Sequence, residues 1–327
     1  MIGVRAGAGP PARRSTVEEL CYRNRRSRTR IRSGPVLATG RPDKLALPNE
    51  VGFPAPASRG VRLTTYLTVT SAELVTPCLR RVWFRSDDLS AFAGSECTDR
   101  YVKLIFPKAG VTYPDPIDVR ALRGVMPAED LPTVRTFTAL FPDVESGTMA
   151  IDFVLHGDEG VAGRWAATAA PGDQLMVNGP GGAYRPDPTA DWHLLVGDET
   201  AIPAISAALA DLQPDAVVRA ILLVDSEADE PKLDVPARGE VTFLHRREIG
   251  ADGVLEAAVR ELEWLPGRVH AFVHGEAHEV MRRIRPHLFR ERGLTRDQVS
   301  ISGYWRRGRT EEGFREWKAE LARAEGR

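Results

Sequence analysis

The pattern of hydrophobic and polar positions changes twice along the chain. Before about residue 62 no apolar periodicity is sustained. Short runs rich in β-branched and aromatic residues then follow one another, separated by polar breaks, up to about residue 185. Beyond Asp187, compact apolar strands alternate with helical segments. The pattern predicts a disordered leader over residues 1–60, a β-domain over 61–187 and an α/β domain over 188–327.

The middle part predicts a small antiparallel barrel of six strands. The expected strands cover residues 62–70, 79–85, 101–106, 134–141, 148–155 and 174–178, with a short helix over 163–170. The stretch 108–132 is rich in proline and aspartate. It is expected to be a loop, because its prolines interrupt both a central strand and a regular helix.

The last part predicts a parallel sheet covered by helices. The expected strands cover residues 192–196, 217–224, 241–244, 268–273 and 298–302, and the expected helices cover 201–212, 253–262, 276–288 and 310–324. Ligands of such sheets bind at the carboxyl ends of the strands. A barrel next to that edge would create an interdomain cleft for a cofactor.

Charge is balanced overall but uneven along the chain. The formal net charge is −1, yet residues 1–60 contain 12 Lys and Arg against 4 Asp and Glu. The overall balance argues against a dedicated nucleic-acid binder. The basic leader is open to three interpretations: an arm for nucleic acid or anionic lipid, a transit peptide, or a dispensable extension. No apolar stretch approaches the ~20 residues that span a bilayer, so we expect a cytoplasmic protein without membrane association.

The expected strand around residue 135 carries the first candidate site, Arg135-Thr136-Phe137-Thr138. Alternate residues of a strand share a face, so Arg135 and Phe137 point the same way. An arginine beside an aromatic ring suits a phosphate attached to a flat heterocycle. The alternative is an exposed arginine next to a core phenylalanine.

Two strand–glycine–helix junctions suggest ligand contacts of different kinds. Residues 152–157 lead through Gly160 into a helix, whose unpaired first N–H groups suit a pyrophosphate. Residues 194–203 form a second junction, which lacks the G-x-G-x-x-G fingerprint. Asp198 and Glu199 there would repel a phosphate, so a ribose or a nicotinamide ring fits better. Ordinary glycine turns are the alternative for both.

The end of the sheet adds a further junction at Gly275-Glu276 and the segment Tyr304-Trp305-Arg306-Arg307. A core tryptophan and a solvated arginine pair are the alternative interpretation of that segment. Three histidines at residues 270, 274 and 278 would align as metal ligands on a helix, but Gly275 and a strand pattern interrupt them. We therefore expect no metal site. Three cysteines without C-x-x-C spacing disfavour a disulfide scaffold and a cysteine-ligated metal.

Taken in order, these segments resemble the siderophore-interacting proteins, flavin-dependent ferric-siderophore reductases of the ferredoxin–NADP reductase-like superfamily. The resemblance covers about residues 62–320. The motifs are TPCLRRV at 76–82, YVKLIFP at 101–107, RTFT at 135–138, DFVLHG at 152–157, GVAGRWA at 160–166, PGD at 171–173, GPGG at 179–182, GDETAIP at 197–203, GEA at 275–277 and GYWRRG at 303–308.

The resemblance implies an antiparallel flavin-binding barrel followed by a parallel α/β domain like those that bind pyridine nucleotides. It implies FAD as cofactor, NAD(P)H or reduced ferredoxin as electron donor, and a ferric siderophore as substrate. Arg135 would face the FAD phosphates, Phe137 the isoalloxazine and Thr138 the reactive flavin nitrogen. The other residues implied around the cofactors are Thr136, Phe153, Val154, Leu155, His156, Ala162, Gly163, Arg164, Trp165, Gly197, Asp198, Glu199, Thr200, Gly275, Glu276, Tyr304 and Trp305. Arg306 and Arg307 would help to capture an anionic chelate.

Three positions depart from the family pattern R-x-Y-T-x-R and its helix-opening serine. Phe137 replaces the tyrosine, Leu140 the second arginine and Gly163 the serine. Each replacement removes a polar group from the expected FAD site, and Arg164 is an alternative source of charge. Two rival functions stay open: a general NAD(P)H:flavin or quinone oxidoreductase, and a non-catalytic siderophore binder without flavin.

Overall fold

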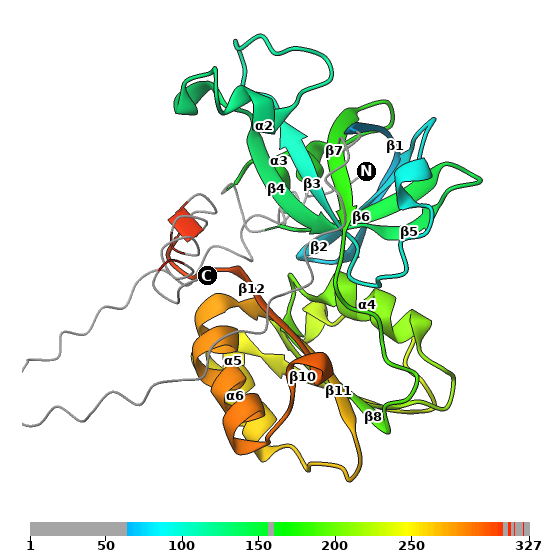
Figure 1. Cartoon of the computed structure of the whole chain (residues 1–327), viewed down its shortest axis with the longest axis vertical. Coiled ribbons are helices and arrows are strands. Elements are labelled where there is room, and N and C mark those ends of the chain that lie inside the picture. Colours follow the sequence, from blue (N-terminus) through cyan, green and yellow to red (C-terminus); the bar gives the residue numbers. More distant parts are fainter. Residues whose placement is uncertain (1–63, 156–159, 310–312, 315–316, 318–322, 324–327) are drawn as a thin grey trace, which may run out of the picture. The chain divides into compact units, whose positions relative to one another are not determined.

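The structure of the chain is a computed structural model, which describes residues 64–155, 160–309, 313–314, 317 and 323 (Figure 1). All described residues belong to one compact unit, Leu63–Arg327. The expected leader, His156 and most of the expected helix over 310–324 lie outside the described residues. No helix in the described part of the chain combines the length and apolarity that crossing a membrane requires.

The first sheet is antiparallel throughout, as predicted, but it has seven strands rather than six. The difference arises because the expected strand over 134–141 is interrupted at Ala139. The strands are β1 (Thr64–Thr76), β2 (Leu79–Arg85), β3 (Tyr101–Phe106), β4 (Thr133–Thr138), β5 (Leu140–Asp143), β6 (Thr148–Val154) and β7 (Gln174–Gly181).

The order of these strands, β4-β3-β7-β1-β2-β6-β5, requires the sheet to curl. β4 and β5 form opposite edges of the sheet, yet Ala139 is the only residue between them. One residue spans at most a few ångströms, so the two edges must approach each other, as in a barrel. Alternate apolar side chains such as Leu67, Phe84 and Ile151 fill the interior.

The excursion between β3 and β4 is more ordered than the sequence predicts. It contains the single helical turn α2 (Val119–Leu122) and the short turn η2 (Ala128–Asp130) beside β3 and β4 (Figure 1). The Asp118 carboxylate caps α2 by accepting from the first backbone N–H groups of the turn. Ile117 and Leu122 pack with Ile105 in a small separate cluster, which holds the excursion against β3.

The second sheet is parallel, as predicted, with the order β10-β9-β8-β11-β12. Its strands are β8 (Trp192–Asp198), β9 (Val217–Val224), β10 (Arg238–His245), β11 (Val269–Glu276) and β12 (Val299–Trp305). The strand order changes direction between β8 and β11, which is where such sheets form a ligand crevice. One hydrophobic cluster joins this layer to the barrel, because Leu79 and Tyr184 pack with Ile202 and Ile205.

The helical segments agree with the predicted alternation except after β11. They are α3 (Val161–Thr168), α4 (Ile202–Asp211), α5 (Arg246–Ile249), α6 (Val254–Glu261), the π-helical turns η4 (Glu279–Ile284) and η5 (His287–Glu291), and the short turns η1 (Ser90–Phe92), η3 (Glu227–Asp229) and η6 (Arg296–Gln298). The prediction of a helix over 276–288 was wrong at its first residue, because β11 continues through Glu276.

Candidate functional site

Strand β4 presents Arg135 and Phe137, both half-buried, on one face. The Phe137 ring lies 4.8 Å from the ring of Phe153 on β6. Thr136 points to the opposite, exposed side, where Lys103 Nζ donates to its hydroxyl at 3.4 Å. Thr138, the last residue of β4, is buried. The strand therefore offers a cation and a partly accessible ring two residues apart.

Aromatic rings connect this strand to helix α3. The fully buried Phe153 ring lies 5.7 Å from Trp165 of α3, which also stacks on Phe84 at 6.2 Å. Phe153 is thus a core residue that supports both Phe137 and Trp165. The two predicted segments, 135–138 and 162–165, meet around this one side chain.

No side chain of a described residue caps the N-terminus of α3. Gly160 precedes it with φ of +91°, a conformation that favours glycine. The first-turn N–H groups of Val161, Ala162 and Gly163 have no acceptor within the helix. Together with the helix dipole, these groups suit an anion. A Cβ on Gly163 would meet only the Val154 carbonyl oxygen, at 3.5 Å, so a serine would fit there.

Other groups of this turn are already engaged. The Leu155 backbone N–H donates to the Cys78 carbonyl at 2.8 Å, so it is not available to a phosphate. The Arg164 guanidinium turns back and donates to the Gly160 carbonyl at 3.4 Å. Leu140, at the position of the family's second arginine, is completely buried in β5. The first backbone amides of α3 therefore remain the groups of this turn that suit an anion.

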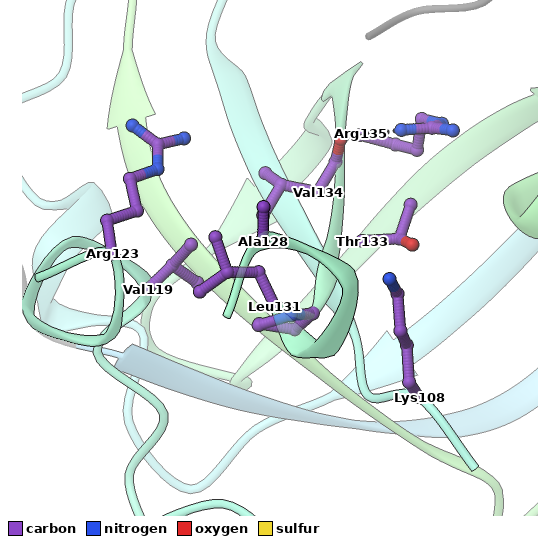
Figure 2. A pocket seen from close by; sticks show the side chains of 9 residues that line it. Lys108, Val119, Arg123, Ala128, Leu131, Thr133, Val134 and Arg135 are labelled. Carbon is purple, nitrogen blue, oxygen red and sulfur yellow. Dashed lines mark hydrogen bonds between the residues drawn. The ribbon is translucent and has the colours of Figure 1, made fainter. Parts of the chain in front are cut away.

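A pocket of about 360 Å³ lies between the excursion and the start of β4 (Figure 2). It is lined by Lys108, Val119, Arg123, Ala128, Leu131, Pro132, Thr133, Val134 and Arg135. Sequence reasoning missed this pocket, because the excursion was expected to be only a loop. Two isolated basic residues, 15 positions apart in a proline-rich segment, give no local signal that they share a site.

At the edge of the parallel sheet, Asp198 joins three predicted segments. This aspartate is only 1% exposed. Its Oδ2 accepts from the Glu276 N–H at 2.9 Å and from the Trp305 indole N–H at 2.7 Å, and its Oδ1 accepts from the Thr200 N–H at 3.0 Å. Asp198 therefore ties Trp305 of β12 to the carboxyl ends of β8 and β11.

The glycines of the two junctions permit this close approach. A Cβ on Gly197 would lie 2.8 Å from the His274 carbonyl oxygen. Gly275 has φ of +146°, and a Cβ there would lie 2.7 Å from Asp198 Oδ2. Tyr304 packs into the same region, with its ring 4.9 Å from that of His274. These glycines permit close packing at the carboxyl ends of β8 and β11.

Glu276 binds the segment that follows β12. One carboxylate oxygen accepts from the N–H groups of His278 and Glu279 at 2.8 and 2.9 Å, and the other accepts from Arg306 Nη1 at 2.7 Å and the Arg307 N–H at 3.0 Å. Burial opposes ionisation, but the Glu279 amide and the Arg306 guanidinium outweigh it and lower the pKa of Glu276. The positive charge of Arg306 is thereby compensated by Glu276, whereas the Arg307 side chain is exposed.

Glu199 is engaged in a similar way. Its buried carboxylate forms a two-pronged ion pair with Arg246, whose Nη2 lies 2.6 Å from Oε2. No local pattern indicated this partner, because 47 positions separate the two residues. The acidic residues at the carboxyl edge of the sheet, Asp198, Glu199 and Glu276, are therefore all bonded within the chain.

The two layers together define a ferredoxin reductase-like fold, an antiparallel barrel followed by a parallel sheet of order 3-2-1-4-5. The ferredoxin reductase of carbazole 1,9a-dioxygenase has this fold, with a TM-score of 0.53 at 17% identity over 74% of this chain and 70% of that one. A siderophore utilization protein from T. fusca is more similar, with a TM-score of 0.64 at 36% identity over 76% of this chain and 94% of that one.

The chain belongs to the siderophore-interacting protein family. Residues 68–184 match the siderophore-interacting FAD-binding domain, and residues 190–308 match the siderophore-interacting protein domain. The uncharacterized protein Rv2895c of Mycobacterium tuberculosis is 45% identical over 270 residues, 79% of this chain and 95% of that protein. The ferric vibriobactin reductase ViuB of Vibrio cholerae is 33% identical over 249 residues, 74% of this chain and 89% of that protein.

Proposed function

We propose that this protein is an FAD-dependent oxidoreductase that reduces Fe(III) bound in siderophores and releases Fe(II). NAD(P)H is the proposed electron donor, with reduced ferredoxin as the alternative. The observation that carries the proposal is the pairing of Arg135 and Phe137 on β4 with the uncapped N-terminus of α3 around Phe153. The match to a siderophore-interacting FAD-binding domain and the likeness to ViuB support it.

The residues at this end of the barrel fit FAD. Phe137 would stack on the isoalloxazine, and Arg135 and the first amides of α3 would hold the diphosphate. Thr138 would lie near the reactive flavin nitrogen. When bound, FAD supplies the exchange between a two-electron donor and a one-electron acceptor. The core ring of Phe153 keeps Phe137 in place, so the stacking surface is preorganised.

The crevice of the parallel sheet is the proposed donor site. Residues 197–200 and 275–276 would border the nucleotide. Their carboxylates are bonded internally, so they would shape the crevice and hold Trp305 rather than bond the ligand directly. The donor would then be recognised mainly through its ring and ribose.

Iron release follows from ligand chemistry. Hard oxygen ligands hold Fe(III) much more strongly than Fe(II), so reduction weakens the chelate without requiring a protein acid or base. Most ferric siderophores that hold iron through such oxygen ligands are anionic. The exposed Arg307 would attract them electrostatically, whereas the charge of Arg306 is already compensated by Glu276.

The test is an anaerobic titration of the purified full-length protein. We expect a flavin absorption spectrum that bleaches with NADPH or NADH and recovers on addition of a ferric catecholate. Each NAD(P)H should yield two Fe(II), trapped by a ferrous-specific chelator. Reduction of quinones or free flavin with equal efficiency, and without preference for the ferric chelate, would favour a general oxidoreductase.

The buried Leu140 gives one rival function a structural basis. Without the second arginine, the protein could serve as a siderophore binder that carries no flavin. Colourless protein that stays colourless after FAD is added, but still binds a ferric siderophore, would establish that rival and overturn our proposal.

A further inference from the structure

The pocket between the excursion and β4 is strongly basic. Lys108, Arg123 and Arg135 contribute three cations, none of its lining residues is acidic, and Val119 and Leu131 are part of an apolar wall. In Figure 2, Lys108 and Arg123 approach from opposite sides of that wall. A basic pocket with an apolar wall suits a ligand that combines phosphate with a flat, weakly polar group.

The charges of the two excursion residues are not compensated by a carboxylate of the described part of the chain. The Lys108 ammonium donates to the backbone carbonyl of Glu129. Arg123 is exposed and forms no ion pair with a described residue. By contrast, Arg81, which lies on β2, is held by both oxygens of Asp152 at 2.7 and 2.8 Å. The pocket therefore retains a net positive charge that favours a dianion.

The position of the pocket along β4 indicates which part of a ligand it would take. A strand rises ~3.3 Å per residue, so Thr133 lies ~13 Å from Phe137, with Arg135 midway. An extended FAD whose ring lies at Phe137 and whose diphosphate lies at Arg135 would direct its adenosine toward Thr133. A volume of about 360 Å³ accommodates part of a dinucleotide but not all of it.

We propose that this pocket holds the adenosine-phosphate half of FAD, and that Lys108 and Arg123 supply the positive charge that the buried Leu140 does not. The inference rests on the proposed flavin function. It assigns cofactor binding to the excursion, which contains none of the site residues expected from the sequence. It would also account for FAD binding by a chain that lacks the second arginine.

The experiment compares FAD with FMN, which lacks the adenosine monophosphate part. Dissociation constants are measured by flavin fluorescence for flavin-depleted full-length wild type, Lys108→Met, Arg123→Met and the double variant. Lys232→Met and Arg85→Met serve as controls at exposed positions outside the pocket. Wild type should bind FAD at least tenfold more tightly than FMN. The double variant should bind FAD at least tenfold more weakly, with FMN affinity unchanged within twofold and both controls like wild type.

Competition by ADP tests the same site without a substitution. ADP should displace FAD from wild type but should not displace FMN to the same extent. Wild type that prefers FAD no more than FMN, or variants that weaken both flavins equally, would overturn the inference and leave the flavin function intact. Variants that bind FAD normally but raise the KM for a ferric chelate would assign the pocket to the substrate instead. Wild type that binds neither flavin would overturn both proposals.

Discussion

A buried histidine of the parallel sheet makes the stability of the protein depend on pH. His193 lies on β8, is 3% exposed, and has no hydrogen-bond partner for Nδ1 among the described residues. The ring of His270 lies 6.3 Å away and accepts a hydrogen bond from the Asp187 N–H at 3.0 Å. Burial, with a smaller contribution from His270, lowers the pKa of His193 from 6.5 to about 4. The imidazole is therefore neutral in the folded protein at pH 7.

The sign of the effect follows from proton linkage. Because the folded pKa lies below the unfolded value, the unfolded state binds the extra proton between about pH 6.5 and pH 4. The free energy of unfolding therefore falls as the pH falls through that window. At 1.36 kcal/mol per unit, the full effect of the shift in the pKa of His193 is about 3 kcal/mol, of which about 2 kcal/mol is lost by pH 5. The pKa of His270 is lowered too, mainly by burial, so it acts in the same direction.

Urea unfolding at pH 7.5 and pH 5 measures this effect in wild type, His193→Gln and a control, His278→Gln. The relevant quantity is the change in the free energy of unfolding between the two pH values, because His193→Gln also alters packing at both. We expect that change to be about 2 kcal/mol smaller in His193→Gln than in wild type. The half-buried control should behave like wild type. Equal pH dependence in wild type and His193→Gln would refute the reasoning.

Three substitutions at the proposed cofactor and substrate sites have expected outcomes. Arg135→Met should raise the Kd for FAD about 10- to 100-fold, because a charge-assisted hydrogen bond contributes about 1.5–3 kcal/mol. A fluorescence titration that shows unchanged affinity for FAD would contradict the proposed contact between Arg135 and the diphosphate. Gly163→Ser should lower that Kd several-fold by adding a donor where a Cβ meets only the Val154 carbonyl, and weaker binding would argue against an anion at α3. Glu276→Gln should remove the ion pair with Arg306 and therefore lower both the KM for an anionic ferric catecholate and the Tm, the latter by several degrees. An unchanged KM would count against electrostatic attraction of the chelate by Arg306.

The sequence by itself determined the class of each layer and the local character of the candidate site. Short runs rich in β-branched and aromatic residues predicted the antiparallel strands, and compact apolar strands that alternate with helical segments predicted the parallel sheet. Because alternate residues of a strand share a face, the sequence also placed Arg135 and Phe137 on one face of β4. The glycine before α3 and the glycines near the carboxyl ends of β8 and β11 marked three junctions. All of these features depend on residues close together in the chain, which is why local periodicity and turn chemistry reveal them.

Only the tertiary structure decided which of these residues meet and which remain available. Ala139 divides one expected strand because the two edges of the barrel must approach each other there. Asp198 meets Trp305, 107 positions away, since parallel strands bring distant carboxyl ends to one edge. Leu140 is buried, and the excursion forms a pocket with basic lining residues at the start of β4. Contacts of this kind depend on strand order and packing, which bring together residues that no local pattern connects.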